Sequence, residues 1–369
     1  MSPEPRPGAG LPAINVPRAG RWQPPSSLSP EERRDRRTYV SHYLHALDER
    51  YRDLDEGEPA GYIPAVARAD RGAFGIAVMA NDGSENHVGD AHDLFSIQSI
   101  SKVLLYALAL ETLGRDEVHE RVGVEPSGEQ FNSIDIDEAS NRPFNPMVNA
   151  GAITVADLVP GKDLDERLQL VLDAYRRFLG REVEVDETIF RSELATAHRN
   201  RAIAYLLLSR GVLQERVEET IELYTLQCSV LVTAHDLAVA AATLGNAGVN
   251  PVTRERALPQ DSVRDVLSVM LTCGMYDYSG EWVYRVGLPA KSGVGGGVMA
   301  VLPGIGGLGV YSPPLDRFGN SVRALRVCED MAHDLRVHLF EPGLPWEPHP
   351  EEQPDEDGPA EVGPGQAAE

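Results

Sequence analysis

The sequence predicts an α+β fold in which helices flank an antiparallel sheet and an all-helical subdomain is inserted. Strand patterns occur near both ends of the chain, at residues 73–80 and within 281–312. Between them, from about 115 to 250, apolar residues mostly follow helical spacing. We therefore expect strands from the two ends to join one sheet, with the helical block beside it. A cleft between the two parts would be the natural place for a site.

The first elements have clear local signals. Ser29 is a helix-capping residue, Pro30 suits the first helical position and Glu32 completes a capping box, so a helix should begin at Pro30. Residues 73–80 (AFGIAVMA) resemble a buried strand, and Asn81-Asp82-Gly83 predicts the turn of a hairpin. Further helices are expected at 100–113, 163–179, 199–210, 214–226, 233–245, 262–273 and 321–339.

Composition divides the chain into three parts. Residues 1–28 are rich in Pro and Gly and are expected to be disordered, as is the acidic, Pro-rich tail 341–369. Residues 29–340 should form the catalytic domain, with the helical subdomain at about 115–250. The net charge of −23 argues against a nucleic-acid partner, because an acidic surface repels phosphate.

Three features favour a cytoplasmic protein. The chain lacks an apolar run long enough to span a membrane, and its N-terminus has no secretory pattern. Its three cysteines, Cys228, Cys273 and Cys328, are odd in number and have no CxxC spacing. This usage fits a reducing compartment and disfavours a disulfide frame or a structural zinc site.

Lysine is rare in this chain. Of 34 basic side chains, only Lys102, Lys162 and Lys291 are lysine, and the rest are arginine. Arginine remains protonated in proteins, whereas a desolvated lysine can become a neutral base. The three positions are therefore candidates for chemistry that arginine cannot perform.

The main catalytic signal is the segment 95–102 (FSIQSISK), which contains Ser99-x-x-Lys102 at the start of a predicted helix. Residues three apart lie on one helix face, so a neutral Lys102 could take the proton of the Ser99 hydroxyl. Serine β-lactamases and penicillin-binding proteins use this device. Alone, the motif is more often a helix cap with a solvated lysine.

A second motif strengthens the first. Lys291-Ser292-Gly293 begins a predicted strand late in the chain, where the β-lactamase superfamily has a Lys-Thr-Gly element. In a catalytic reading, this strand would edge the site and offer a lysine charge and backbone N–H groups to substrate and oxyanion. The alternative is an ordinary strand edge. Together the two motifs predict a serine β-lactamase-like fold.

The chain closely resembles the serine-dependent glutaminases over about residues 35 to 340. The resemblance rests on motifs that occur in order and with fitting spacing. They are 57–67 (GEPAGYIPAVA), 95–102 (FSIQSISK), 123–132 (GVEPSGEQFN), 144–153 (FNPMVNAGAI), 192–200 (SELATAHRN), 224–229 (YTLQCS), 273–280 (CGMYDYSG) and 287–294 (GLPAKSGV).

The resemblance implies that the chain hydrolyses L-glutamine to L-glutamate and ammonia without a cofactor or metal. Ser99 would be the acylated nucleophile and Lys102 its activating partner. Asn149, Glu193 and Asn200 would hold the α-amino acid part of the substrate, with Glu193 on the α-ammonium group. The family also implies a homo-oligomer.

Other residues have roles that the resemblance implies. Tyr224 and Tyr276 would line the pocket, contact substrate and pass protons. The backbone N–H groups of Val294 and Ser99 would form the oxyanion hole, and Tyr62 would belong to a mobile lid.

Structural readings remain open for single residues. Asn149 could be a turn residue, Glu193 and Asn200 helix caps, and the two tyrosines ordinary core aromatics. Two rival functions also remain: another acyl-serine amidohydrolase of β-lactamase or penicillin-binding type, and a silent glutamine-binding protein.

One motif is a decoy. Residues 304–309 (GIGGLG) satisfy the GxGxxG pattern of dinucleotide-binding loops, but residues 310–314 (VYSPP) follow and cannot open a helix. A hairpin loop between two strands is the better reading.

Overall fold

The computed structural model describes residues 30–128 and 136–341, and the side chains of its first helix from residue 37 onward. Helix α1 (Pro30–Tyr51) begins at Pro30, as predicted. Ser29, the arm expected at 1–28 and nearly all of the tail expected at 341–369 lie outside the described residues.

The main sheet joins both ends of the chain, which confirms the prediction. Its strand order is β2-β1-β7-β6-β5, and every neighbouring pair is antiparallel. The strands are β1 (Gly75–Ala80), β2 (Glu85–Gly89), β5 (Ala290–Ser292), β6 (Gly297–Leu302) and β7 (Gly306–Tyr311). A second, two-stranded sheet pairs β3 (Phe95–Ser96) with β4 (Leu231–Val232).

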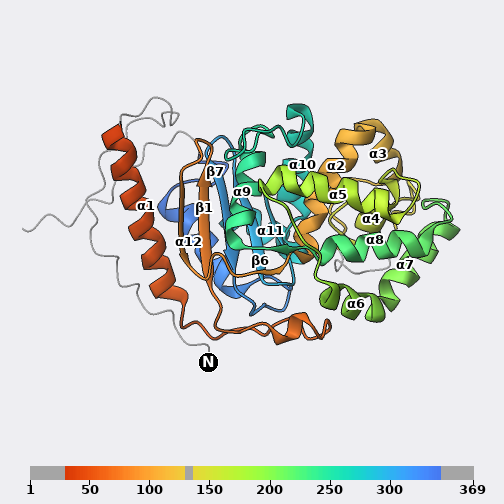
Figure 1. Cartoon of the computed structure of the whole chain (residues 1–369), viewed down its shortest axis with the longest axis horizontal. Coiled ribbons are helices and arrows are strands. Elements are labelled where there is room, and N and C mark those ends of the chain that lie inside the picture. The colour runs from red at the N-terminus through yellow and green to blue at the C-terminus, as the bar shows by residue number, and fades with distance from the viewer. Residues whose placement is uncertain (1–29, 129–135, 342–369) are drawn as a thin grey trace, which may run out of the picture.

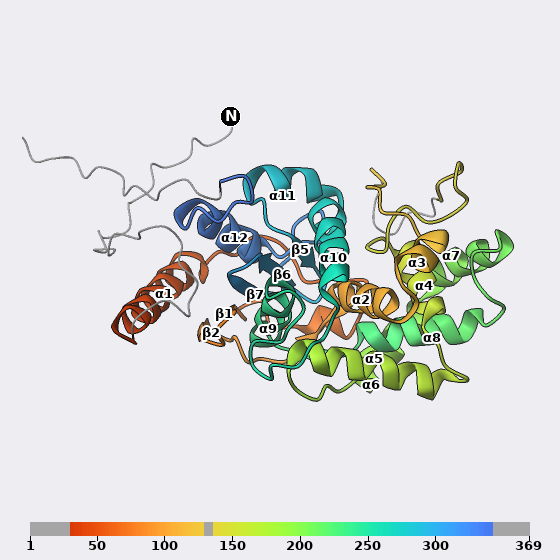
Figure 2. The same ribbon diagram turned by 90° about the horizontal axis from the view of Figure 1, so that it is seen from above.

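Alternate residues of the central strands face two different helical layers. On β6, Val298 and Ala300 belong to the apolar cluster shared with α1 and α12 (Val322–Asp334). Met299 and Val301 belong to the opposite cluster, which includes α9 (Ala234–Gly245). This period of two places the sheet between helices on both sides (Figures 1 and 2).

Glycines on β7 allow α9 to approach the sheet closely. A Cβ on Gly307 would come within 2.3 Å of the Ala242 backbone nitrogen, and one on Gly309 within 2.0 Å of the Ala234 carbonyl oxygen. The GxGxxG segment is therefore the β6–β7 turn and the start of β7, as the hairpin reading predicted. Its glycines serve sheet–helix packing.

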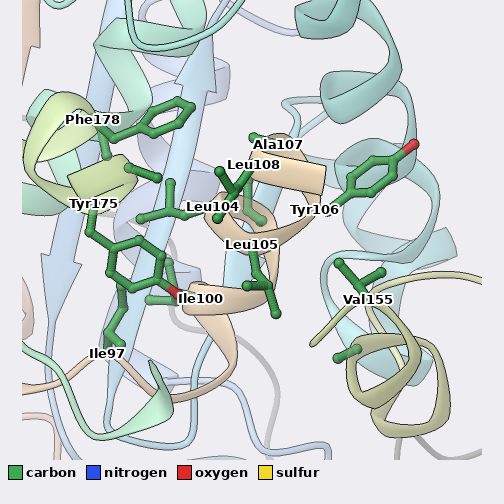
Figure 3. Close-up of a cluster of buried hydrophobic side chains, with 14 of the residues drawn as sticks. Ile97, Ile100, Leu104, Leu105, Tyr106, Ala107, Leu108, Val155, Tyr175 and Phe178 are labelled. Carbon is green, nitrogen blue, oxygen red and sulfur yellow. The ribbon is translucent and has the colours of Figure 1, made fainter. Parts of the chain in front are cut away.

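The helical part lies beside the sheet in Figure 1 and is reached through α2 (Ser101–Leu113). The α2 residues from 101 to 110 are all buried, and their apolar side chains pack between the sheet side and the other helices (Figure 3). The remaining helices of this part are α3 (Arg115–Arg121), α4 (Asn149–Leu158), α5 (Leu164–Leu179), α6 (Glu187–Thr196), α7 (His198–Ser209) and α8 (Val217–Cys228). The predicted block runs to about 250, but its last helix, α9, covers the sheet.

Three predicted boundaries are wrong, the smallest error being at the helix expected from 214, which begins at Val217. Residues 281–285 were expected to be β structure but belong to α11 (Ser279–Arg285), where Trp282 is fully buried and donates a hydrogen bond to the Leu288 carbonyl. The last helix was expected to reach 339 but ends at Asp334, because Arg336 adopts a left-handed φ of +50°. Helix α10 (Gln260–Cys273) and the short turns η2 (Val66–Arg68), η3 (Gln98–Ile100) and η4 (Tyr276–Tyr278) complete the fold.

Candidate active site

A strained turn carries Ser99. The Ile97 N–H donates to the Val230 carbonyl at 2.8 Å, and Gln98 then adopts a left-handed φ of +47°. The Ser101 hydroxyl closes the turn by donating to the Gln98 carbonyl at 2.6 Å. Ser99 thus lies in η3, directly before α2, as the sequence predicted for a serine at a helix start.

Lys102 lies within the first turn of α2 and is buried. Its Nζ donates to Asn149 Oδ1 at 2.7 Å and to the Met147 carbonyl at 3.2 Å. Burial lowers the pKa of Lys102 to about 8, against the opposing influence of Cys228 and Glu193. About a tenth of this amine is therefore neutral at pH 7, far more than for an ordinary lysine, and a base for serine must be neutral.

The loop before α4 places both acceptors of Lys102. Asn145 Oδ1 accepts hydrogen bonds from the Met147 and Val148 N–H groups, which folds the chain into a tight turn. Gly151 permits this, because a Cβ there would lie 1.9 Å from the Asn145 carbonyl oxygen. The conformation of the NPMVNAG segment thus aims a backbone carbonyl and the Asn149 amide at the lysine.

Four polar side chains from the helical part form what we call the helix wall: Asn149, Glu193, Asn200 and Tyr224. Asn149 Nδ2 donates to Asn200 Oδ1 at 3.0 Å, and the Tyr224 hydroxyl lies 3.4 Å from Asn149 Oδ1. Asn149 begins α4, whereas Glu193 and Asn200 lie within α6 and α7 and are not caps. The helix wall therefore concentrates hydrogen-bonding groups at one place.

Glu193 is buried, with Gln98 as its hydrogen-bonding partner. Gln98 Nε2 donates to Glu193 Oε2 at 3.2 Å. Burial raises the pKa of Glu193 to about 7, although the Gln98 hydrogen bond and Lys102 oppose the rise. A carboxylate desolvated to this degree would gain from an incoming cation, such as an α-ammonium group.

The opposite side, which we call the sheet wall, is made by the Ser99 turn, Tyr276 and the segment 291–294. A Cβ on Gly293 would lie 2.9 Å from the Ile97 carbonyl, so the absent side chain lets β5 approach the turn. The Tyr276 hydroxyl donates to the Ser292 carbonyl at 3.0 Å and is also in hydrogen-bonding contact with the Ser99 side chain. Burial raises the pKa of Tyr276, so its hydroxyl keeps its proton at neutral pH.

A cavity of about 210 Å³ lies between the two walls. It is lined by seven of the residues that the sequence singled out, namely Tyr62, Ser99, Asn149, Glu193, Asn200, Tyr224 and Val294. Tyr62 is 58% exposed and lies at the cavity mouth. The structure therefore brings together residues from six separate motifs.

The remaining predicted residues are buried next to this cavity; they include Tyr276, which was predicted to line the pocket but lines a neighbouring cavity with Met147 and Cys273. Lys102 is fully buried among the Asn149 and Met147 oxygens, and Lys291 and Ser292 are fully buried in β5. Lys291 Nζ donates to the Ser292 carbonyl at 2.6 Å. Tyr276 and Gly293 connect this strand to the Ser99 turn.

Six further lining residues were not predicted: Ile63, Gln98, Thr196, Ala197, Arg199 and Cys228. Each lies inside a motif that the sequence did single out. No simple sequence pattern predicts the role of Gln98, because that role depends on a left-handed backbone and on a partner 95 residues away, Glu193. Burial raises the pKa of the Cys228 thiol to about 12, so it is a poor nucleophile.

Comparison with known proteins decides the family. Residues 57–340 match the family model for glutaminases. The chain belongs to the glutaminase family. It is 53% identical over 303 residues to a glutaminase of Microcystis aeruginosa, covering 82% of this chain and 90% of the relative. A glutaminase of a Nostoc strain is also 53% identical, over 298 residues, with coverages of 81% and 89%.

Solved glutaminase structures share the fold. The glutamate form of Mglu has a TM-score of 0.79 and 44% identity, with 82% of this chain and 69% of that chain covered. The covalent complex between the Bacillus subtilis glutaminase YbgJ and 5-oxo-L-norleucine, formed from 6-diazo-5-oxo-L-norleucine, has a TM-score of 0.76 and 38% identity. It covers 82% of this chain and all of that chain. The chain is thus an amidohydrolase with the β-lactamase-like fold predicted from its sequence.

Helices long and apolar enough to cross a bilayer do not occur among the residues that the structure describes.

Proposed function

We propose that this glutaminase hydrolyses L-glutamine to L-glutamate and ammonia through an acyl-serine intermediate on Ser99. The observation that carries the proposal is the buried amine of Lys102, which has a pKa of about 8 and lies one turn after Ser99. Serine requires such a base, because its hydroxyl is a weak nucleophile while it keeps its proton.

In the first half-reaction, Lys102 takes the proton of Ser99 while the serine oxygen attacks the side-chain amide carbon of glutamine. The negative charge that develops on the amide oxygen would be stabilised by the backbone N–H groups of Ser99 and Val294. The amide nitrogen accepts the proton that Lys102 took from Ser99, passed on through Tyr276, and leaves as ammonia. Water then gives a proton to Lys102 as it attacks the acyl-serine, and this proton returns to the Ser99 oxygen as glutamate leaves.

The tyrosines fit proton delivery better than proton abstraction. Burial raises the pKa values of Tyr224 and Tyr276, so both hydroxyls remain protonated at neutral pH. Tyr276 contacts Ser99 and is thus placed to pass a proton to the leaving nitrogen. We assign the base role to Lys102 for this reason.

The helix wall would recognise the amino acid part of the substrate. Glu193 would pair with the α-ammonium group, while Asn149 and Asn200 would bind by their amides. Tyr62, exposed at the cavity mouth, would close over bound glutamine. The glutamate form of Mglu and the covalent complex of YbgJ with 5-oxo-L-norleucine support this substrate class and a nucleophile that can form a covalent bond to a ligand. A cytoplasmic location and self-association remain predictions of the sequence.

The test is ammonia release from L-glutamine and L-asparagine by the purified chain and by S99A. We expect turnover of glutamine by the wild type and a loss of at least about 1,000-fold in S99A. If the wild type released no ammonia from either amide, with or without added phosphate, the alternative of a glutamine-binding protein without catalytic activity would be favoured. Near-full activity of S99A would remove Ser99 from the mechanism.

A further inference from the structure

Lys291 does not occupy the place that its motif suggested. The Lys-Ser-Gly element predicted a lysine that faces substrate or oxyanion, yet the described residues that line the cavity do not include it. Lys291 is fully buried in the middle of β5. Its Nζ lies over the Tyr276 ring, 4.1 Å from the ring centre.

The same backbone carbonyl holds both side chains. The Ser292 oxygen accepts a hydrogen bond from Lys291 Nζ at 2.6 Å and one from the Tyr276 hydroxyl at 3.0 Å. A carbonyl oxygen has two lone pairs, so both bonds can form at once. Lys291 therefore fixes Tyr276 at the face of its ring and, through Ser292, at its hydroxyl.

Tyr276 needs such restraint. Its φ of +54° is left-handed, which is unfavourable for a residue with a bulky side chain. Strained backbone persists only where the surroundings hold it. Tyr276 is also the aromatic side chain whose hydroxyl contacts Ser99. A change of its χ1 angle or of its backbone would move that hydroxyl away from the nucleophile.

The electrostatics agree with a positioning role. Burial and the nearby Lys102 lower the pKa of Lys291 well below its usual value. Among the residues that the structure describes, the ion pairs do not involve Lys291; they include an exposed pair of Lys162 with Glu166. A neutral amine keeps two N–H groups, which match a carbonyl oxygen and the face of an aromatic ring.

We propose that Lys291 is a positioning residue, which holds the ring and hydroxyl of Tyr276 beside Ser99 through the shared Ser292 carbonyl. This inference rests on the proposed function, in which Tyr276 passes a proton during glutamine hydrolysis. It departs from the motif-based expectation, because Lys291 would act on the reaction without touching the substrate.

The test is a double-mutant cycle on ammonia release from L-glutamine, with K291M and Y276F. Methionine fills the lysine volume but cannot donate to Ser292. We expect K291M to lower kcat by about 10- to 100-fold, as a small misplacement of a reacting group does. KM should change by less than about threefold, because the helix wall is intact. The double variant should be no slower than Y276F, because Lys291 acts through that hydroxyl.

Two further variants complete the design. K291Q, which retains an N–H donor, should have a kcat between those of K291M and the wild type. K162M removes an exposed lysine and should behave as the wild type. Thermal unfolding of each variant separates misplacement from loss of folding, and if K291M does not fold, the same cycle with K291Q gives the decision.

Three results would overturn the inference. They are an unchanged kcat in the Lys291 variant, a loss that adds fully to that of Y276F, or a rise in KM with kcat unchanged. The last would restore a substrate-contacting lysine. Failure of the proposed function is distinguishable, since it would show as an active S99A whatever the Lys291 variants do.

Discussion

The two walls of the cavity are built by different means. The sheet wall is fixed largely by its backbone: Gln98 and Tyr276 both have left-handed φ values, and Gly293 lets β5 approach the Ser99 turn. The helix wall is fixed by side chains, through the hydrogen bond between the Asn149 and Asn200 amides and that between Gln98 and Glu193. Backbone conformation thus positions the atoms that would react. Side-chain hydrogen bonds, in contrast, hold the surface that would bind the substrate.

Lys102 connects the walls, because it follows Ser99 on the sheet side and donates to Asn149 on the helix side. If this division holds, changes at the sheet wall and Lys102 should act mainly on kcat. Changes at the helix wall should act mainly on KM. The following predictions test the division, beginning with the largest effect.

Lys102→Met should lower kcat by at least about 1,000-fold, because Ser99 would lose its base. Glutamate binding, followed by calorimetry, should persist, since the helix wall keeps its carboxylate and amides. The control is K162M, which removes an exposed lysine paired with Glu166. Activity of K102M within tenfold of the wild type would transfer the base role to another group.

The pH dependence of kcat/KM should show a rise between pH 6 and 8. Lys102 has a folded-state pKa of about 8, below its usual value, so the neutral base becomes more abundant as pH increases through that value. Glu193, with a pKa of about 7, gains its charge over the same range. The expected profile increases by about 50-fold through Lys102 alone, by several hundredfold where both groups contribute, and levels off above about pH 9. A profile that falls from pH 6 to 8 would contradict both assignments.

Glu193→Gln should raise KM for glutamine by about tenfold or more and leave kcat within about threefold. The amide keeps the shape and can still accept from Gln98, but it loses the charge that would pair with an α-ammonium group. E187Q, an exposed glutamate on the same helix, is the matched control. A fall in kcat without a change in KM would mean that the helix wall takes part in the chemistry.

The smallest kinetic effect is expected from Gly309→Ala, which lies outside both walls. Its new Cβ would meet the Ala234 carbonyl at 2.0 Å, so the α9–sheet contact must loosen and stability should fall by about 1–3 kcal/mol. The folded fraction should keep kcat and KM within about twofold. Gly280→Ala, where a Cβ would meet open space, controls for the glycine itself. A large loss of kcat in G309A would show that sheet packing, and not only local backbone, sets the catalytic geometry.

Sequence reasoning reached the fold and most of the cavity for a physical reason. The apolar pattern of 73–80 and the glycines of 304–309 reflect packing that is local in sequence, and the Ser99–Lys102 spacing is one helical turn. Family resemblance then supplied Asn149, Glu193 and Asn200, whose proximity arises from three different helices and could not be read from spacing.

The parts that were missed depend on long-range geometry. Gln98 matters because its backbone is left-handed and its amide reaches Glu193 from a distant segment. Lys291 was predicted to support the site, but its contact with the Tyr276 ring depends on how η4 folds against β5. Residues 281–285 were wrongly assigned to β structure, because a seven-residue helix that buries only Ser279 and Trp282 is too short to show a helical period.

The central claim is that Ser99 forms a covalent intermediate. The most direct measurement is peptide mass mapping after reaction of the wild-type chain with 6-diazo-5-oxo-L-norleucine, beside S99A treated in the same way. The account predicts one adduct, on Ser99, that appears as ammonia release stops and is absent from S99A. An adduct on another residue, or loss of activity without any adduct, would contradict it.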